Sequence, residues 1–300
     1  MFMVKLDKMK SSLALVLSLL TFTQARAQSS GNTTQPPPAG WYVYSAKEVD
    51  SESLHCLNYT MTSWRVSAED NDVRITEYRP QAVQQSPLPS GFQLRPEWSR
   101  GRRHSLKFEG GWLIGIDAGE WGGGLWITNE DGSASRIIVE DDVSGIVPTA
   151  QGIFVLSGLA HSGFDFGNVL MLSHPHDMQV TLEWTASLVS APQAYVKLAD
   201  DSVLVIDRFG AWQITSSGGL KRLFYLKPVR GFYPLANSIV KTANGTIYVG
   251  MRTFVLRFLP GGVGQTGTKS EYTEDFLLPD TCRKFKMDWN RNRMQCTCTP

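Results

Sequence analysis

The stretch Gly111–Gly132, GWLIGIDAGEWGGGLWITNEDG, decides the fold of this chain. Its aromatic and β-branched residues predict two short strands, Trp112–Asp117 and Gly124–Thr128. The glycine-rich, acidic run between them predicts a loop, and Asp131-Gly132 predicts a tight turn. One such strand–loop–strand unit cannot bury both of its faces, so it needs neighbours of the same kind.

The same unit returns three times further along the chain. The four repeats span residues 104–140, 145–184, 194–225 and 237–278, and each has the pattern of four short strands. The second strands open at Trp112, Gly152, Ser202 and Gly245, which are 40, 50 and 43 residues apart. Four strands in every 40–50 residues are typical of a β-propeller. The sequence therefore predicts an all-β fold.

Two of the repeats support this prediction by resemblance. The segments DSVLVIDRFGAWQITSSGG (201–219) and GTIYVGMRTFVLRFLPGG (245–262) resemble the repeats of NHL-type and related six-bladed β-propellers. The resemblance extends over residues 104–260 and implies a fold, not an activity, because it carries no catalytic motif. The aspartate that usually closes the second strand is present at Asp117 and Asp207 and absent from the other two repeats.

The first 40 residues have the composition of an export signal followed by a leader. Lys5, Lys8 and Lys10 precede an apolar run at 11–23, and Ala25-Arg26-Ala27 offers a cleavage site before Gln28. This order predicts a secretory signal peptide at 1–27, and hence a secreted or periplasmic protein. Residues 28–40 are rich in proline and polar side chains and predict a flexible leader.

The rest of the chain, 41–300, is expected to form a single propeller domain. At about 44 residues per blade, the 273 residues after the signal peptide suffice for six blades, with five as the alternative. We expect N- and C-terminal strands to share one blade and so close the ring. In this scheme Arg283–Asp288 and Arg293–Cys298 are its first strands, and Trp41 and its neighbours supply the outer ones.

The four cysteines predict structural disulfides. Cys56, Cys282, Cys296 and Cys298 all follow the signal peptide, and export favours their oxidation. Three pairings are available, and one bond is expected to tie the C-terminal tail to Cys56. The alternative use of Cys296 and Cys298, in metal binding or thiol exchange, lacks a nearby histidine or second cysteine pair.

Charge and motifs exclude several classes of function. Removing residues 1–27 takes four basic and one acidic side chain from totals of 29 and 28, which leaves a net formal charge of −2. Nucleic-acid binding needs a basic surface, so it is excluded. No later apolar run is long enough for a transmembrane anchor. The sequence also lacks the motifs of serine hydrolases, zinc proteases and phosphate loops. We expect a monomer.

One face of the propeller is expected to carry the binding residues. In each blade the loop between the second and third strands emerges on the same side as the connection to the next blade. We call this side the loop face. Its loops include Asp117–Gly123 and the ten residues Gly158–Gly167, and its connections include Lys227–Leu235. The candidate ligand-binding residues are Asp117, Glu120, Trp121, His161, Asp165, Arg208, Arg230, Tyr233 and Arg252.

Several of these residues have two interpretations. Asp117 and Glu120 offer oxygen ligands for Ca²⁺ or an acid–base pair, or else they cap a glycine-rich turn. Trp121 and Trp126 pack between blades or form a ligand platform. The arginines suit an anionic or carbohydrate-like ligand, or salt bridges to aspartates.

The sequence therefore favours a binding module that engages a protein, carbohydrate or small molecule through the loop face, without a cofactor. The alternative is a propeller-type hydrolase or lyase with a metal-assisted or charged pocket at the central channel.

Overall fold

The computed structural model describes residues 35–44, 62–70, 72–78, 85–226, 235–261 and 272–282, and the backbone of 284–290 and 293–299. The predicted signal peptide lies outside the described residues, as do most of the leader, Cys56, Arg230, Tyr233 and the side chains of Cys296 and Cys298. The chain separates into a unit of residues 1–36 and a unit of residues 37–300, and the description below concerns the second.

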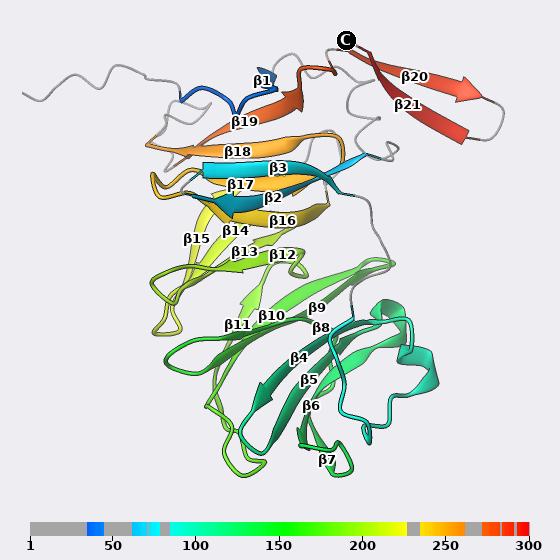
Figure 1. Ribbon diagram of the computed structural model, residues 1–300, viewed down its shortest axis with the longest axis vertical. Helices are drawn as coiled ribbons and strands as arrows, with labels where there is room; N and C mark the ends of the chain where they lie inside the picture. Colours follow the sequence, from blue (N-terminus) through cyan, green and yellow to red (C-terminus); the bar gives the residue numbers. More distant parts are fainter. Residues whose placement is uncertain are drawn as a thin grey trace, which may run out of the picture. The chain divides into compact units, whose positions relative to one another are not determined.

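The described part of the chain is all-β apart from two single 3₁₀ turns, η1 (Pro96–Trp98) and η2 (Gly119–Trp121). Three four-stranded antiparallel sheets and one five-stranded sheet follow one another in chain order (Figure 1). Each sheet corresponds to one repeat predicted from the sequence. This is the arrangement of a propeller-like fold, while the number of blades and the closure of a ring stay predictions.

The first two sheets bring together consecutive strands. The first has the order β4 (Arg102–Phe108), β5 (Gly111–Asp117), β6 (Gly123–Asn129) and β7 (Ser135–Val139). The second contains β8 (Val143–Pro148), β9 (Ile153–His161), β10 (Phe164–Leu172) and β11 (Leu182–Leu188).

The third and fourth sheets repeat this pattern. The third contains β12 (Ala194–Lys197), β13 (Val203–Asp207), β14 (Gly210–Ile214) and β15 (Leu220–Tyr225). The fourth contains β16 (Ala236–Lys241), β17 (Ile247–Met251), β18 (Val255–Pro260) and β19 (Tyr272–Pro279), with β1 (Trp41–Tyr44) added at its outer edge.

The second strand of each sheet is buried on both faces. In β9, Ile153 and Val155 pack in a cluster with residues of the first sheet, whereas Phe154 and Leu156 pack with residues of the third. The strands β13 and β17 divide their side chains in the same alternating way. Successive residues of a strand point to opposite faces, so a continuous apolar run serves two neighbouring sheets.

The N-terminal hairpin covers the far side of the fourth sheet. It consists of β2 (Ser63–Glu69) and β3 (Asp72–Tyr78), and Val66 and Val73 share an apolar cluster with Tyr248 of β17. The amide of Val66 donates to Ser238 Oγ at 2.9 Å. Segments about 170 residues apart in sequence are thereby joined.

The terminal strands pair differently from the prediction. The strand β1 lies antiparallel to β19, with Trp41 opposite Pro279, because its tyrosines find an apolar cluster there. The strands expected to join it, β20 (Lys284–Asn290) and β21 (Arg293–Thr299), pair with each other in a two-stranded sheet. The prediction that these strands form one blade with Trp41 is therefore wrong.

Cys282 follows directly after this region. It is buried and disulfide-bonded, and its carbonyl oxygen accepts a hydrogen bond of 2.6 Å from Tyr42 Oη. The other cysteine side chains are not among those described, so the pairing stays a prediction.

Glycines allow neighbouring sheets to approach closely. A Cβ atom added at Gly115 would lie 2.4 Å from Val143 Cγ1 of the next sheet. One added at Gly145 would lie 2.4 Å from Tyr195 Cε1 of the third sheet. The absence of a side chain at these positions is therefore a packing requirement.

We predict that Gly145→Ala destabilises the protein by about 1–3 kcal/mol, as overpacking of a core does. If the cause is the contact with Tyr195, the cost of Gly145→Ala falls in a Tyr195→Ala background, where the obstructing ring is gone. Urea unfolding of the two single variants and the double variant measures this coupling. Strictly additive free energies would contradict the proposed contact.

Candidate functional site

The connection between the first two sheets forms the centre of the loop face. It consists of Glu140, Asp141 and Asp142, between β7 and β8. Asp142 Oδ1 accepts a hydrogen bond of 3.1 Å from the amide of Ala118, and its carbonyl oxygen accepts one of 2.9 Å from Gly158. Asp142 thus links the end of β5 to β9.

The aspartate that ends a second strand holds the turn that follows it. Asp117 Oδ1 accepts from the amide of Gly119 at 3.2 Å, while Oδ2 pairs with Arg102 at 2.7 Å. Asp207 accepts from the amides of Phe209 and Gly210 and from Trp212 Nε1, at 2.7–2.8 Å. Both carboxylates accept hydrogen bonds from the amides of the following turn. For Asp117, this is the turn-capping interpretation and not the calcium-binding one.

Two side-chain contacts bring together residues that the sequence predicted for the loop face. His161 Nε2 lies 2.9 Å from Glu120 Oε2 and links the second sheet to the first. Arg208 lies 3.3 Å from Asp165 Oδ2 and links the third sheet to the second. Asp165 also accepts a hydrogen bond from Ser190 Oγ, in the connection to β12. The structure therefore places these residues on one side of three consecutive sheets.

The prediction of a long loop at 158–167 is wrong. Both strands continue into it, so that His161 pairs with Phe164 and Asp165 with Ala160. The turn itself is only Ser162-Gly163, with φ of 47° and 93°. Positive φ at both central residues is typical of a two-residue hairpin turn, and Ser-Gly allows it. His161 and Asp165 therefore lie on an extended hairpin.

Arg252 lies beside the fourth sheet, where it forms an isolated β-bridge with Ser63. Arg230 and Tyr233 lie outside the described residues.

The geometry does not strengthen the calcium hypothesis. Asp117 is engaged by Arg102 and Glu120 by His161, so their carboxylates have separate partners. Among the described residues there is no group of three or more His, Cys, Asp or Glu side chains placed to hold a metal ion.

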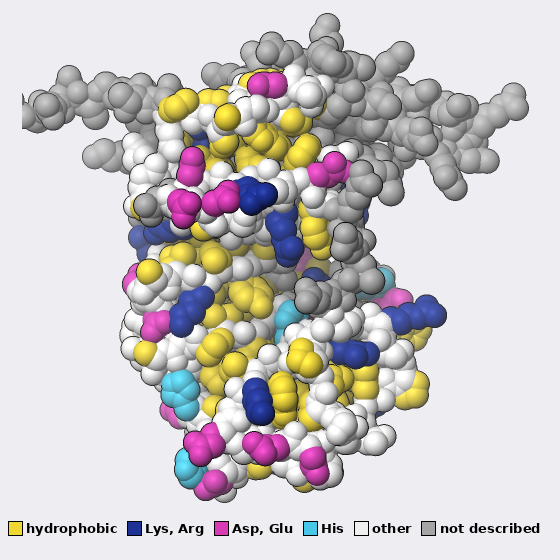
Figure 2. Space-filling model, in the orientation of Figure 1, with side chains coloured by type: hydrophobic (Ala, Val, Ile, Leu, Met, Phe, Trp, Pro, Cys, Tyr) yellow, Lys and Arg dark blue, Asp and Glu magenta, His cyan; other side chains and the backbone are white. Residues whose placement is uncertain are grey.

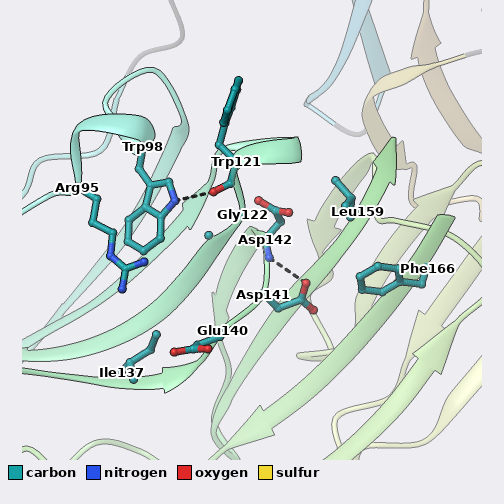
Figure 3. A pocket seen from close by; sticks show the side chains of 11 residues that line it. Arg95, Trp98, Trp121, Gly122, Ile137, Glu140, Asp141, Asp142, Leu159 and Phe166 are labelled. Atoms are coloured by element: carbon teal, nitrogen blue, oxygen red, sulfur yellow. Dashed lines mark hydrogen bonds between the residues drawn. The ribbon is translucent and has the colours of Figure 1, made fainter. Parts of the chain in front are cut away.

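A cleft of about 310 Å³ opens between the first sheet and the β9–β10 hairpin (Figure 3). Its apolar side chains are Trp98, Trp121, Ile137, Leu159 and Phe166. Its charged side chains are Arg95, Glu140, Asp141 and Asp142. Acidic and basic side chains are otherwise interspersed over the face shown in Figure 2.

The tryptophans near the cleft have different roles. Trp126 packs against Trp98, with ring centroids 5.0 Å apart, and contacts the buried apolar cluster behind the cleft. Trp98 Nε1 donates to the carbonyl oxygen of Trp121 at 2.9 Å and fixes the η2 turn. The Trp121 side chain itself is 65% exposed and stands at the rim. Of the two tryptophans considered from the sequence, Trp126 is the packing residue and Trp121 is available to a ligand.

Sequence reasoning missed much of this cleft. Arg95 and Trp98 precede the first predicted repeat, which begins at residue 104, and Phe166 falls in the predicted loop Gly158–Gly167. The signal was present in the pattern: tryptophan is costly to expose, and Phe164 and Phe166 alternate with Asp165 as in a strand.

The interior of the cleft has an unusual carboxyl group. Asp142 is 3% exposed, and burial raises its pKa to about 6, with further contributions from the negative charges of Asp117 and Asp141. The hydrogen bond from Ala118 acts in the opposite direction but does not compensate. The carboxylates of Asp117 and Asp141 therefore repel that of Asp142, which is itself shielded from water.

This shift predicts a pH-dependent effect of Asp142→Asn. Between about pH 4 and pH 6 the unfolded chain loses the proton that the folded chain retains, so wild-type stability falls as pH rises through this window. Asparagine preserves the acceptor and removes the charge. We expect no gain near pH 4 and a gain of up to about 3 kcal/mol at pH 7, in urea unfolding.

Asp131→Asn provides the matched control. Hydrogen bonds from Ser133 lower the pKa of the exposed Asp131, so its substitution should cost more stability at neutral than at acidic pH. A gain from Asp142→Asn that is constant with pH would contradict the assignment.

The described residues include no helix that is both long and apolar enough to cross a membrane. No protein-family model matches the chain, and no curated protein matches it.

Three solved structures align with most of this chain at 10–12% sequence identity. One is the extracellular domain of the one component system BT4673 from B. thetaiotaomicron, at 12% identity and a TM-score of 0.37, over 70% of this chain and 28% of that chain. Another is PorZ, a surface component of the type-IX secretion system of Porphyromonas gingivalis, at 10% identity and a TM-score of 0.36, over 65% and 32%.

A third is virginiamycin B lyase from Staphylococcus aureus, at 12% identity and a TM-score of 0.36, over 78% of this chain and 73% of that chain. This chain thus spans about a third or less of the first two proteins.

Proposed function

We propose that this chain is an exported β-propeller module that binds a ligand through its loop face, at the cleft between the first two sheets. The observation that carries the proposal is the cleft itself. Trp121 and Phe166 remain 65% and 42% exposed beside it. Large aromatic side chains that the fold could bury, but instead holds at the opening of a cleft, are typical of binding sites.

The surroundings of the cleft supply the rigidity that a binding site needs. The backbone at Trp121 is fixed by the hydrogen bond that its carbonyl oxygen accepts from Trp98, and Phe166 lies on a hairpin paired through His161 and Phe164. The contact between Glu120 Oε2 and His161 Nε2 joins the two sides. Little conformational entropy is then lost when a ligand binds. The basic groups of the signal peptide and the apolar run after them support export.

We predict that the purified protein binds a subset of probes on combined glycan and peptide arrays, and that Trp121→Ala and Phe166→Ala each reduce this binding at least about tenfold. Loss of an aromatic contact of 1–2 kcal/mol accounts for such a factor. Leu182→Ala is the matched control, because Leu182 is 48% exposed but lies outside the cleft. Binding that survives both aromatic substitutions, or no binding at all, would overturn the proposal.

A second candidate, a hydrolase or lyase with a charged pocket, is favoured by one observation. Asp142 has a pKa of about 6 in the cleft, where a carboxylic acid can deliver a proton near neutral pH. Mass spectrometry of the array ligands after incubation separates the two candidates. A binding module leaves its ligand intact, whereas an enzyme of this kind changes it and loses turnover in Asp142→Asn.

A further inference from the structure

The cleft carries a surplus of negative charge. Glu140, Asp141 and Asp142 follow one another along its floor, and Arg95 is the one cationic side chain among the described residues that line it. In the described part of the chain, none of the three carboxylates forms an ion pair with a lysine, arginine or histidine. The Arg95 guanidinium instead lies 4.4 Å from the centre of the Trp98 ring.

Two of these carboxylates can accept more hydrogen bonds. Asp141 Oδ1 accepts from the amide of Asp142 at 2.9 Å, and Oδ2 accepts from Ser157 Oγ at 2.8 Å. Each oxygen retains a second lone pair, and the two bonds hold the group in a fixed orientation. Glu140 is exposed beside it, with Ile137 as its neighbour in Figure 3. Asp141 thus offers acceptor oxygens of fixed orientation, and the exposed Glu140 offers acceptor oxygens that can adjust their position.

The opposite wall of the cleft is apolar. Leu159 and Phe166 are cross-strand partners in the β9–β10 hairpin, so their side chains lie on the same face of it. Figure 3 shows the Phe166 ring directed toward Asp141. An aromatic ring close to a carboxylate suits a ligand group that is cationic at its end and apolar along its stem.

We propose that the cleft binds a single lysine or arginine side chain of a peptide, with the cationic group at Asp141 and Glu140 and the alkyl stem along Phe166 and Leu159. This rests on the proposed function and specifies its ligand. The Arg95–Trp98 contact is an internal example of the same cation–aromatic chemistry. The volume of about 310 Å³ is at the lower end for ligand sites and suits one side chain.

A neutral sugar matches this cleft less well. It would cover the aromatic rings but leave the repulsion among the carboxylates in place, whereas a cation relieves it. Burial is the main cause of the raised pKa of Asp142, and the negative charges of Asp117, outside the cleft, and Asp141, within it, raise it further. Charge complementarity therefore selects the cationic peptide from the ligands that an aromatic cleft accepts.

The test uses acetylated, amidated glycine tripeptides with arginine, lysine, citrulline or glutamate at the centre, and cellobiose as a neutral sugar. Binding to the full mature chain is measured by isothermal titration calorimetry at low salt. We expect the arginine and lysine peptides to bind at least about tenfold more tightly than the citrulline peptide, which has nearly the same shape without the charge.

Glu140→Gln should weaken the cationic peptides about fivefold or more, as loss of one charge-assisted contact predicts. Glu109→Gln makes the same change of net charge outside the cleft and should alter affinity less than about twofold. Glu140 is exposed and has no hydrogen bond among the described residues, so an unchanged melting temperature confirms that the variant folds.

The outcomes separate this inference from the proposed function. Equal binding of the citrulline and arginine peptides, or equal effects of Glu140→Gln and Glu109→Gln, would overturn the inference. Binding of cellobiose that depends on Trp121 and Phe166, without binding of cationic peptides, would overturn it and leave the proposed function standing. Absence of binding both here and on the arrays would overturn both.

Discussion

The structure depends on strands that are buried on both faces. Each second strand sends alternate side chains into two different clusters, as Phe154 and Val155 do from neighbouring positions in β9. At about 25 cal/mol for each square ångström of apolar surface removed from water, such strands dominate the folding free energy. No sheet can therefore bury its own apolar surface, and neighbouring sheets stabilise one another by burying it together.

The same packing fixes the candidate site. Because Gly115 and Gly145 let adjacent sheets approach closely, the ends of their strands are held near one another. The connection at Glu140–Asp142 is tied to both β5 and β9 by hydrogen bonds from Ala118 and Gly158. The cleft thus forms at a junction between two sheets, where strands and the turns that follow them present the side chains.

The site also shows that one hairpin can serve two neighbours. In β10, Phe166 faces the cleft next to the first sheet, and Asp165, one residue earlier, pairs with Arg208 of the third. This alternation is the ordinary two-residue period of a strand, extended beyond the edge of the sheet. The sequence predicted Asp165 and Arg208 for one face, but it placed Asp165 and Phe166 in a loop, whereas both strands continue to the Ser162-Gly163 turn.

The sequence by itself determined the four repeats and their strands, because these follow from local alternation and turn chemistry. Only the tertiary structure decided that β1 pairs with β19 and that β2 and β3 cover the fourth sheet. Pairing of distant segments depends on which apolar surfaces remain uncovered when the others have packed. The cleft was likewise decided by the tertiary structure, because Trp98, Asp141 and Phe166 come together only where different segments pack.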